Sequence, residues 1–395
     1  MTRVRACAGA KVRWWVLALV FVHVVSGFSR TTPAQEAPVR GLTAAPRLAR
    51  AYDAVLDARF DEVPRLVQQA CPPAPAEACQ LLDTVALWWQ IQLDPLNRSR
   101  DEAFVAKADA AVAAAEAWTV REPLRAEAWF YLGGAYGARV QFQSLRGELL
   151  SAARDGKRIK ASLEQALALD PAMHDAYFGI GLYHYYADVA PTALKMLRWL
   201  LLLPGGDREQ GLQEMLRARN RGELARSEAD YQLQLLYVWY EKQPARALEI
   251  LAELHDRHPH NPHFLQLIAE VHDAYLFDPA ASLKAWQVLL DATRGRRVGE
   301  AAMAEATARL GLALQLDRLD QSDAALAHLR AVIAARPPAP YGALARAHLQ
   351  LADVLAKRGR REEAVSAYHA AIAAAPPGDP MKIRARANAQ LRYVR

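Results

Sequence analysis

The distribution of apolar residues after residue 45 constrains the fold more than any other feature of the sequence. Apolar residues recur there at helical spacing almost throughout, and the alternating β-branched runs typical of strands are missing. Pro or Gly interrupts the pattern at short intervals, as at Asp94-Pro95, Asp170-Pro171 and Pro376-Pro377. Short helices with such breaks cannot bury their apolar faces alone and must stack on one another. The sequence therefore predicts an all-α chain of stacked helical hairpins.

The spacing of large and small residues identifies the kind of hairpin. In the 34-residue tetratricopeptide signature, large, small, large, turn, small, large, small and stop positions follow one another in a fixed order. The last copy has Leu351, Ala352, Leu355, Gly359, Ala364, Tyr368, Ala371 and Pro376 at these positions. A second copy has Tyr231, Val238, Ala247, Leu251 and Pro259, and others begin near Trp129, Tyr177, Phe264 and Thr307. The chain resembles tetratricopeptide repeat proteins, and this resemblance implies a right-handed α-solenoid.

The signature match divides the chain. We expect a tetratricopeptide-like array over 123–380, because the spans before it match the signature poorly and indicate a divergent N-terminal helical cap over 45–122. Residues 35–44 are interpreted as a flexible linker. Residues 381–395 carry five basic residues and no acid, which favours a basic capping helix, with an acidic membrane surface as the alternative partner.

The first residues predict the compartment. Four basic residues and no acidic ones precede an apolar run that ends at Phe28, and small residues follow at Thr32-Pro33-Ala34. This is the pattern of a secretory signal peptide over 1–34, cut near Ala34 or alternatively after Gly27. The apolar run is shorter than the ~20 residues of a spanning helix, so a retained anchor is the weaker alternative. We therefore expect export to the periplasm or cell envelope.

Removing this segment changes the charge and the cysteine content. Of 49 basic and 43 acidic residues, five basic ones lie in 1–34, which leaves 44 against 43. A nearly neutral chain gives no electrostatic reason to expect a nucleic-acid partner. Cys71 and Cys79 remain, and the prolines between them indicate a turn that brings the two together as a disulfide. A pair of buried free thiols is the alternative.

Residues 170–216 stand apart from the generic repeats. They contain Phe-Gly-Ile-Gly-Leu-Tyr-His-Tyr-Tyr from Phe178, an expected apolar helix over Ala193–Leu203, and then Gly206-Asp207-Arg208-x-x-Gly211-Leu212. This stretch resembles the tetratricopeptide protein 39 and inclusion-body-clearance family and related exported bacterial repeat proteins, which implies a non-enzymatic adaptor. Asp207 with Gln210 three residues on predicts a helix N-cap, and the sequence leaves Asp188 and Glu209 open as partners of Arg208.

The chemistry-bearing residues do not form a catalytic motif. Serine-hydrolase, P-loop, zinc-protease and Cys-x-x-Cys patterns are all missing from the sequence, so we expect neither an enzyme nor a cofactor. His255, His258, His260 and His263 lie close together, with His272 on the following helix. Imidazoles bind metals, but prolines break this segment into a turn and no carboxylate or cysteine completes the set. We therefore predict no metal site.

The predicted binding surface is the concave groove, lined by the first helix of each hairpin. Positions three and four apart share one helix face. The residues placed there are Glu127, Phe130, Asp175, Phe178, Leu182, Tyr185, Gln232, Leu236, Trp239, Leu265, His272 and Arg346. Such a groove suits an extended apolar peptide or an amphipathic helix of a protein partner. The alternative is that these residues pack inside a tightly wound superhelix.

A second functional hypothesis is a carrier of a lipid or another apolar ligand. It rests on the aromatic segment Tyr183–Tyr186 and the apolar segment Trp199–Leu203. A deep cleft lined by these residues would favour the carrier, and a continuous shallow face would favour the scaffold for a protein or peptide partner.

Overall fold

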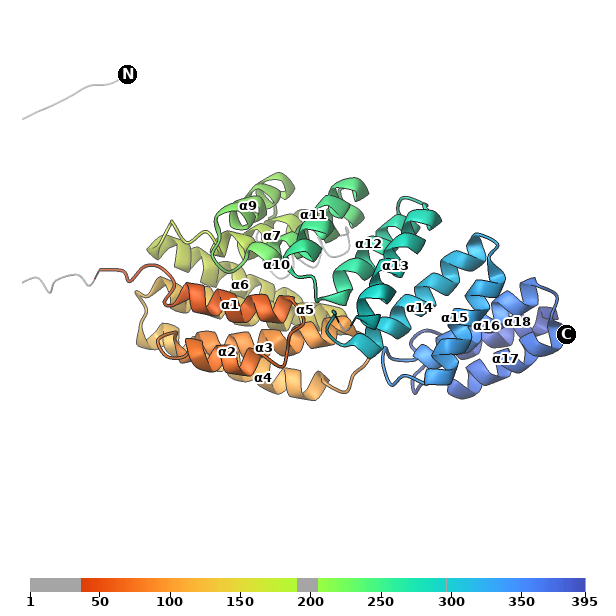
Figure 1. The fold of residues 1–395 in the computed structure, drawn as a ribbon. Coiled ribbons are helices and arrows are strands. Elements are labelled where there is room, and N and C mark those ends of the chain that lie inside the picture. The colour runs from red at the N-terminus through yellow and green to blue at the C-terminus, as the bar shows by residue number, and fades with distance from the viewer. Residues whose placement is uncertain (1–36, 190–204, 296, 395) are drawn as a thin grey trace, which may run out of the picture. The chain divides into compact units, whose positions relative to one another are not determined.

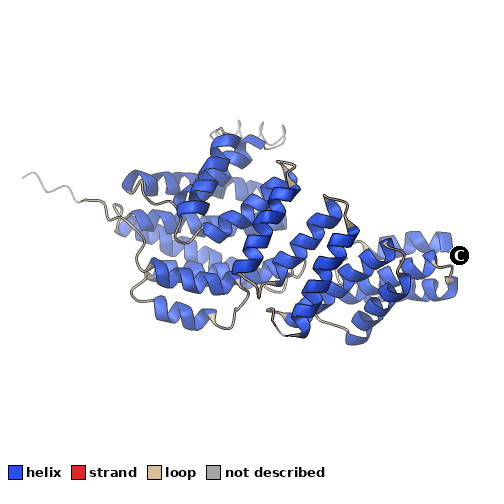
Figure 2. Ribbon diagram, turned by 45° about the horizontal axis from the view of Figure 1, so that its top comes forward, coloured by secondary structure: helices blue, strands red, loops and turns tan. Residues whose placement is uncertain are grey.

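The computed structural model describes residues 37–189, 205–295 and 297–394, and within these ranges the regular elements are helices (Figure 2). The predicted signal peptide over 1–34 and the apolar helix expected over Ala193–Leu203 lie outside the described residues. The helices are α1 (Ala45–Leu56), α2 (Val63–Ala70), α3 (Ala76–Leu93), α4 (Asp101–Arg121), α5 (Ala126–Arg146), α6 (Leu149–Leu169), α7 (Ala176–Val189), α9 (Arg208–Arg221), α10 (Arg226–Trp239), α11 (Pro244–Arg257), α12 (Pro262–Ala274), α13 (Pro279–Arg294), α14 (Ala301–Arg318), α15 (Ser322–Ala335), α16 (Ala343–Lys357), α17 (Arg361–Ala374) and α18 (Ile383–Val394).

The helices pack mainly as pairs of neighbours in the chain. Extensive contacts join the two helices of each pair, namely α5 with α6, α7 with α9, α10 with α11, α12 with α13, α14 with α15, and α16 with α17, and the contact of α13 with α14 between two pairs is of similar extent. The pairs follow one another in chain order from α5 to α17 (Figure 1). This is the architecture of an α-solenoid, in which each hairpin covers the apolar face of the next.

The last hairpin shows why the signature residues specify this packing. Ala352, Ala364 and Ala371 are completely buried, so α16 and α17 approach closely at these positions, and the ring of Tyr368 fills the space between the helices. Gly359 adopts φ = +72° in the turn that joins them, a conformation that side chains other than glycine rarely tolerate. The tetratricopeptide-like hairpin predicted from the spacing is confirmed here.

The contact between α7 and α9 is closer still and depends on two glycines. A Cβ atom on Gly181 would lie 2.6 Å from the carbonyl oxygen of Gly211, and a Cβ atom on Gly211 would lie 2.6 Å from the carbonyl oxygen of Gly181. These residues belong to the stretch that stands apart in the sequence. Glycine is therefore required at both positions for the backbones of the two helices to touch.

Helix α9 begins with the predicted N-cap, but the side chain of its first residue, Arg208, does not bind either of the two predicted partners. The Asp207 carboxylate accepts a hydrogen bond from the Gln210 backbone N–H at 2.9 Å, as expected of an N-cap. The Arg208 side chain binds Glu241, with Nε 2.7 Å from Oε1, in place of either predicted partner. Asp188 instead accepts from the Arg208 backbone N–H at 3.2 Å.

The N-terminal helices reach much further along the array than an end cap would. The Tyr52 hydroxyl of α1 donates to Glu228 of α10 at 2.7 Å, although 176 residues separate them in the chain. The ring of Trp89 on α3 packs 5.0 Å from the ring of Tyr231 on α10 and 6.2 Å from that of Phe264 on α12. Helices α1 and α3 therefore lie against the first helices of later hairpins, where large apolar side chains of α3 such as Trp89 are buried.

Residues 39–43, expected as part of a flexible linker, are instead held by specific hydrogen bonds. The backbone of Val39 exchanges hydrogen bonds with the α4–α5 connection, and Gly41 N–H donates to Asp170 at 2.9 Å. Thr43 donates to the Glu127 carboxylate from both its N–H, at 2.7 Å, and its hydroxyl, at 2.6 Å. The carboxylates of Asp170 and Glu127 thus accept hydrogen bonds from the backbone of this segment.

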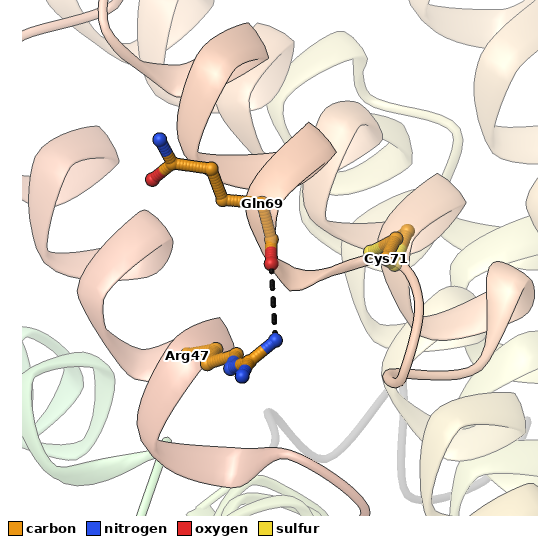
Figure 3. The surroundings of a disulfide bond; sticks show 4 residues. Arg47, Gln69 and Cys71 are labelled. Atoms are coloured by element: carbon orange, nitrogen blue, oxygen red, sulfur yellow. Dashed lines mark hydrogen bonds between the residues drawn. A yellow bond between two sulfur atoms is a disulfide. The ribbon is translucent and has the colours of Figure 1, made fainter.

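A disulfide joins Cys71, directly after α2, to Cys79 in α3 (Figure 3). Close by, the side chain of Arg47 on α1 donates to the backbone carbonyl of Gln69 at 3.4 Å. The cross-link and this hydrogen bond tie the short helix α2 to its two neighbours.

The basic segment at the C-terminal end forms α18, which packs on α16 and α17. Ile383, Ala387 and Leu391 are buried at intervals of four, so one face of the helix covers the end of the core. In the part of the chain that the structure describes, no helix has the length and apolarity needed to cross a membrane.

Candidate functional site

A cavity of about 820 Å³ lies where the N-terminal helices meet the first hairpins. Helices α1, α3, α5, α6, α7 and α10 all contribute side chains to its wall. The wall is built mainly from aliphatic and aromatic residues, with glycine and alanine where helices approach closely. Its depth comes from the position of α1 and α3, which cover what would otherwise be an open concave face.

Half of the predicted groove residues meet in this cavity. They come from α5, the α7 hairpin and α10, which supply the first helices of three consecutive hairpins. These residues are Phe130, Asp175, Phe178, Leu182, Gln232 and Trp239. These groove positions were predicted from the repeat signature. In the structure, their side chains come from separate hairpins and lie on one cavity wall.

Three other predicted groove residues have structural partners instead. Glu127 is 1% exposed and binds Thr43 and Arg125. Tyr185 is completely buried, and its hydroxyl donates to Glu241 at 2.5 Å. Leu236 is completely buried in the main core. None of the three lines the cavity.

The last three predicted residues lie further along the array. Leu265 belongs to a second core cluster that begins at α12. His272 is half-buried on α12, and its Nδ1 has no hydrogen-bond partner among the described residues. Arg346, on α16, is also half-buried, and burial lowers the pKa of its guanidinium, with Glu270 and Asp94 nearby. These three residues are not part of the cavity wall.

The sequence did not predict the contribution of the N-terminal helices. The cavity wall includes Leu48 and Tyr52 of α1, and Leu81, Val85, Trp88 and Gln92 of α3. The sequence of α3 carried one indication, because a helix with many large apolar residues, here including Trp88 and Trp89, is more typical of a buried position than of an exposed cap.

A small polar cluster lies in the otherwise apolar wall. Gln141 of α5 accepts from the Trp88 indole N–H at 3.0 Å and donates to Glu228 at 3.5 Å. Glu228 also accepts from the Tyr52 hydroxyl, and burial raises the pKa of this carboxyl group. Gln232 donates to the same Gln141 oxygen at 3.5 Å. The cluster joins α1, α3, α5 and α10 at one point of the cavity.

The second carboxylate of the wall, Asp175, is fully occupied by backbone donors. It accepts from the N–H groups of Glu223 at 2.9 Å, Leu224 at 2.7 Å and Ala225 at 2.7 Å, directly before α10. These donors and the positive end of the α10 dipole stabilise its charge. Its role is to hold the α9–α10 connection.

Exposed apolar side chains mark the places where the cavity reaches the surface. Leu145 and Leu149, at the turn between α5 and α6, are 36% and 55% exposed, and Trp239 at the end of α10 is 49% exposed. All three also line the cavity. Large apolar side chains that belong to a cavity and to the surface at the same time favour contact with a partner.

The histidines near the α11–α12 turn are separated by their own partners. His258 binds the Ser227 hydroxyl at 3.0 Å, His260 binds Asp57 at 2.8 Å, and His263 binds the Tyr231 hydroxyl at 3.3 Å. Among the residues that the structure describes, no group of three or more His, Cys, Asp or Glu side chains is arranged to hold a metal ion.

Comparisons by sequence give no match for this chain. No protein-family model matches it, and no curated protein matches it either. The narrower resemblance over 170–216 therefore stays a prediction.

Among solved structures, one similar chain is from the crystal structure of the APC/C hetero-tetramer Cut9-Hcn1, with 14% identity and a TM-score of 0.49. That match covers 88% of this chain and 55% of the other, so this chain spans about half the length of that relative. Two further similar structures are NprR in complex with its cognate peptide NprX, at 12% identity and a TM-score of 0.40, and yeast Tom70, at 13% and 0.42.

The match to NprR covers 89% of this chain and 82% of that one, and the match to Tom70 covers 81% and 64%. At these identities and scores the comparisons carry no functional argument. The fold assignment rests on the hairpins themselves, whose small residues, turn glycine and successive pairing follow the repeat signature. The chain is an all-helical solenoid of tetratricopeptide-like hairpins.

Proposed function

We propose that this protein is an exported, non-catalytic repeat scaffold that binds the apolar part of a protein or peptide partner in the cavity between its N-terminal helices and its first hairpins. The observation that carries this proposal is the cavity of about 820 Å³ with its predominantly apolar wall. Sites of roughly 300–1,000 Å³ that combine an apolar wall with a few polar groups are typical of ligand binding.

The rim of the cavity favours a partner larger than the cavity itself. Leu145, Leu149 and Trp239 line the cavity and remain exposed to solvent. A peptide or protein that inserts an apolar segment would cover these side chains with the part of its surface that stays outside. The burial of such exposed apolar area contributes roughly 25 cal/mol per Å² to association.

A carrier of a lipid or another small apolar molecule is the second candidate, and the depth of the site favours it. The wall includes Tyr183 and Tyr186 of the aromatic segment that suggested a carrier, together with Leu163 on the second helix of the first hairpin. The cavity is thus a cleft between helices and not a continuous shallow face. The other segment that suggested a carrier, Trp199–Leu203, lies outside the described residues.

Photo-cross-linking from inside the cavity tests the proposal and separates the two candidates. Phe178, which lines the cavity, is replaced by p-benzoylphenylalanine in the full chain, and the cells of origin are irradiated. The control places the same analogue at Phe277, which is 82% exposed and lies outside the cavity. Both positions carry phenylalanine in the protein, so the two variants differ only in location.

A protein or peptide joined at position 178 and not at position 277, identified by mass spectrometry, supports the scaffold. A small apolar adduct at 178 supports the carrier. An unmodified protein at 178, or equal products at both positions, would contradict binding in the cavity.

Export is a separate part of the proposal and rests on the pattern over residues 1–34. N-terminal sequencing of the protein isolated from its cells tests it directly. A mature chain that begins near Gln35 is expected, and a chain in the cytoplasmic fraction that retains Met1 would contradict it.

A further inference from the structure

The charges on the cavity wall are all of one sign. The residues that line it include two carboxylates, Asp175 and Glu228, and no Lys, Arg or His. The statement applies to the residues that the structure describes. An apolar ligand with a carboxylate or phosphate would find no cationic group on this wall.

The two carboxylates differ in the groups that donate hydrogen bonds to them. Asp175 is occupied by three backbone N–H donors at 2.7–2.9 Å. Glu228 accepts one strong hydrogen bond, from Tyr52 at 2.7 Å, and one weak one, from Gln141 at 3.5 Å. Gln232 and Trp89 also contribute hydrogen bonds to Glu228, so all its donors are neutral side chains and none of them carries a positive charge.

Glu228 differs from Asp230, the other buried carboxylate of α10, in its charged surroundings. It is 7% exposed, and within the described ranges no ion pair reaches it. The neighbouring buried carboxylate Asp230, by contrast, is paired with both Arg219 and Arg257. An uncompensated buried carboxylate is costly, and a ligand cation would remove that cost. The raised pKa of Glu228 has the same physical origin, namely burial.

The surroundings of Glu228 suit a cation in a second way. The rings of Tyr52, Trp88 and Tyr231 line the same cavity. Trp88 and Tyr52 are both connected to Glu228 through hydrogen bonds, directly or by way of Gln141. The electron-rich faces of aromatic rings attract ammonium groups, most strongly where water is excluded.

We infer that the cavity selects an apolar ligand that carries a positive charge, with its ammonium group against Glu228 and its alkyl part along the leucine-lined wall. This inference rests on the proposed function and specifies the chemistry of its ligand. The same chemistry has two sources, namely a free alkylamine and the amino group of an apolar peptide. A fatty acid of equal length is expected to be excluded, because its carboxylate would lie beside that of Glu228.

Isothermal titration of the full-length mature protein with three ten-carbon probes tests the inference. Decylammonium, 1-decanol and decanoate share one chain and differ in the charge of the head group. We expect decylammonium to bind at least 10-fold more tightly than decanol, and decanoate to bind most weakly. This comparison is made on the unaltered protein and does not depend on whether any variant folds.

A pair of matched variants assigns the preference to Glu228. Glu228→Gln keeps the size of the side chain and the acceptor for Tyr52, and it removes the charge. The affinity for decylammonium is therefore expected to fall to that for decanol, and the affinity for decanol to change by less than about 3-fold. The control is Asp353→Asn, which also removes a carboxylate that accepts a tyrosine hydroxyl, from Tyr368 at 2.7 Å, but lies outside the cavity. It should leave all three affinities unchanged.

The outcomes separate the inference from the proposed function. Equal affinity for the three probes, or a preference for decanoate, would overturn the inference and leave binding in the cavity intact. A ten-residue apolar peptide in free and N-acetylated forms distinguishes the sources: tighter binding of the free form supports the inference with a peptide as ligand. If neither the probes nor the peptides bind, both the inference and the proposed function fail.

Discussion

The contact between Gly181 and Gly211 gives the sharpest stability prediction. In Gly181→Ala, the added methyl carbon would lie 2.6 Å from the Gly211 carbonyl oxygen and 2.9 Å from the Met215 backbone nitrogen. Ordinary contacts of this kind are about 3.4 Å or longer, so α7 and α9 must separate by about 1 Å. Overpacking of this kind costs about 1–3 kcal/mol, and a clash of backbone against backbone belongs at the upper end.

Helix propensity partly offsets that cost. Alanine is favoured over glycine in a helix by about 1 kcal/mol, so Gly181→Ala should destabilise the protein by a net amount of about 2 kcal/mol. Gly137→Ala, in α5, is the matched control: a Cβ atom there has nothing within 4 Å, and it should stabilise the protein by up to about 1 kcal/mol.

Urea unfolding followed by circular dichroism measures both variants. Hydrogen exchange should show that the loss in Gly181→Ala begins in the hairpin of α7 and α9, because repeat arrays open locally. If Gly181→Ala were as stable as Gly137→Ala, the account of this close helix contact would be refuted.

Three further predictions concern the disulfide, a buried histidine and the cavity wall. Cys79→Ser should lower the free energy of unfolding by about 2–3 kcal/mol, because the disulfide closes a short loop. If reductant did not change the urea unfolding of the wild type, this prediction would be contradicted. Burial lowers the pKa of His258 to about 4, so the unfolded chain binds more protons between pH 4 and 6.5 and stability falls as the pH drops through that window, by up to about 3 kcal/mol. His258→Asn should flatten this dependence in pH-resolved urea unfolding, and an unchanged slope would count against it. Phe178→Ala combined with Trp239→Ala should weaken partner capture at least 10-fold in a pull-down without altering the helical signal, and undiminished capture would argue against the cavity.

The sequence predicted the hairpins well because their packing rules are local. Small residues such as Ala352 on α16 and Ala364 on α17 specify where two neighbouring helices touch. The turn glycine Gly359 and the N-cap Asp207 likewise act within a few residues of their position. Such features can be read without knowledge of the rest of the chain.

Contacts between residues far apart in the chain could not be predicted from local sequence patterns. The hydrogen bond from Tyr52 to Glu228 joins residues 176 positions apart, and no local pattern indicates that α1 lies against α10. The same holds for Glu127, because no local pattern indicates that Thr43 donates two hydrogen bonds to its carboxylate. The six groove residues that do line the cavity were predictable because successive hairpins repeat one geometry.

The most direct test of the account is to fill the cavity without disturbing the fold. Gly137 lines the cavity, and a side chain added there meets nothing within 4 Å of its Cβ atom. The ring in Gly137→Phe therefore fills part of the cavity, and phenylalanine has a helix propensity no lower than that of glycine. Titration of the neutral apolar dye N-phenyl-1-naphthylamine by fluorescence compares the wild type, Gly137→Ala and Gly137→Phe. We expect saturable binding in the first two proteins and at least 10-fold weaker binding in Gly137→Phe, with its stability unreduced. Equal binding in all three proteins would contradict the claim that this cavity is the binding site.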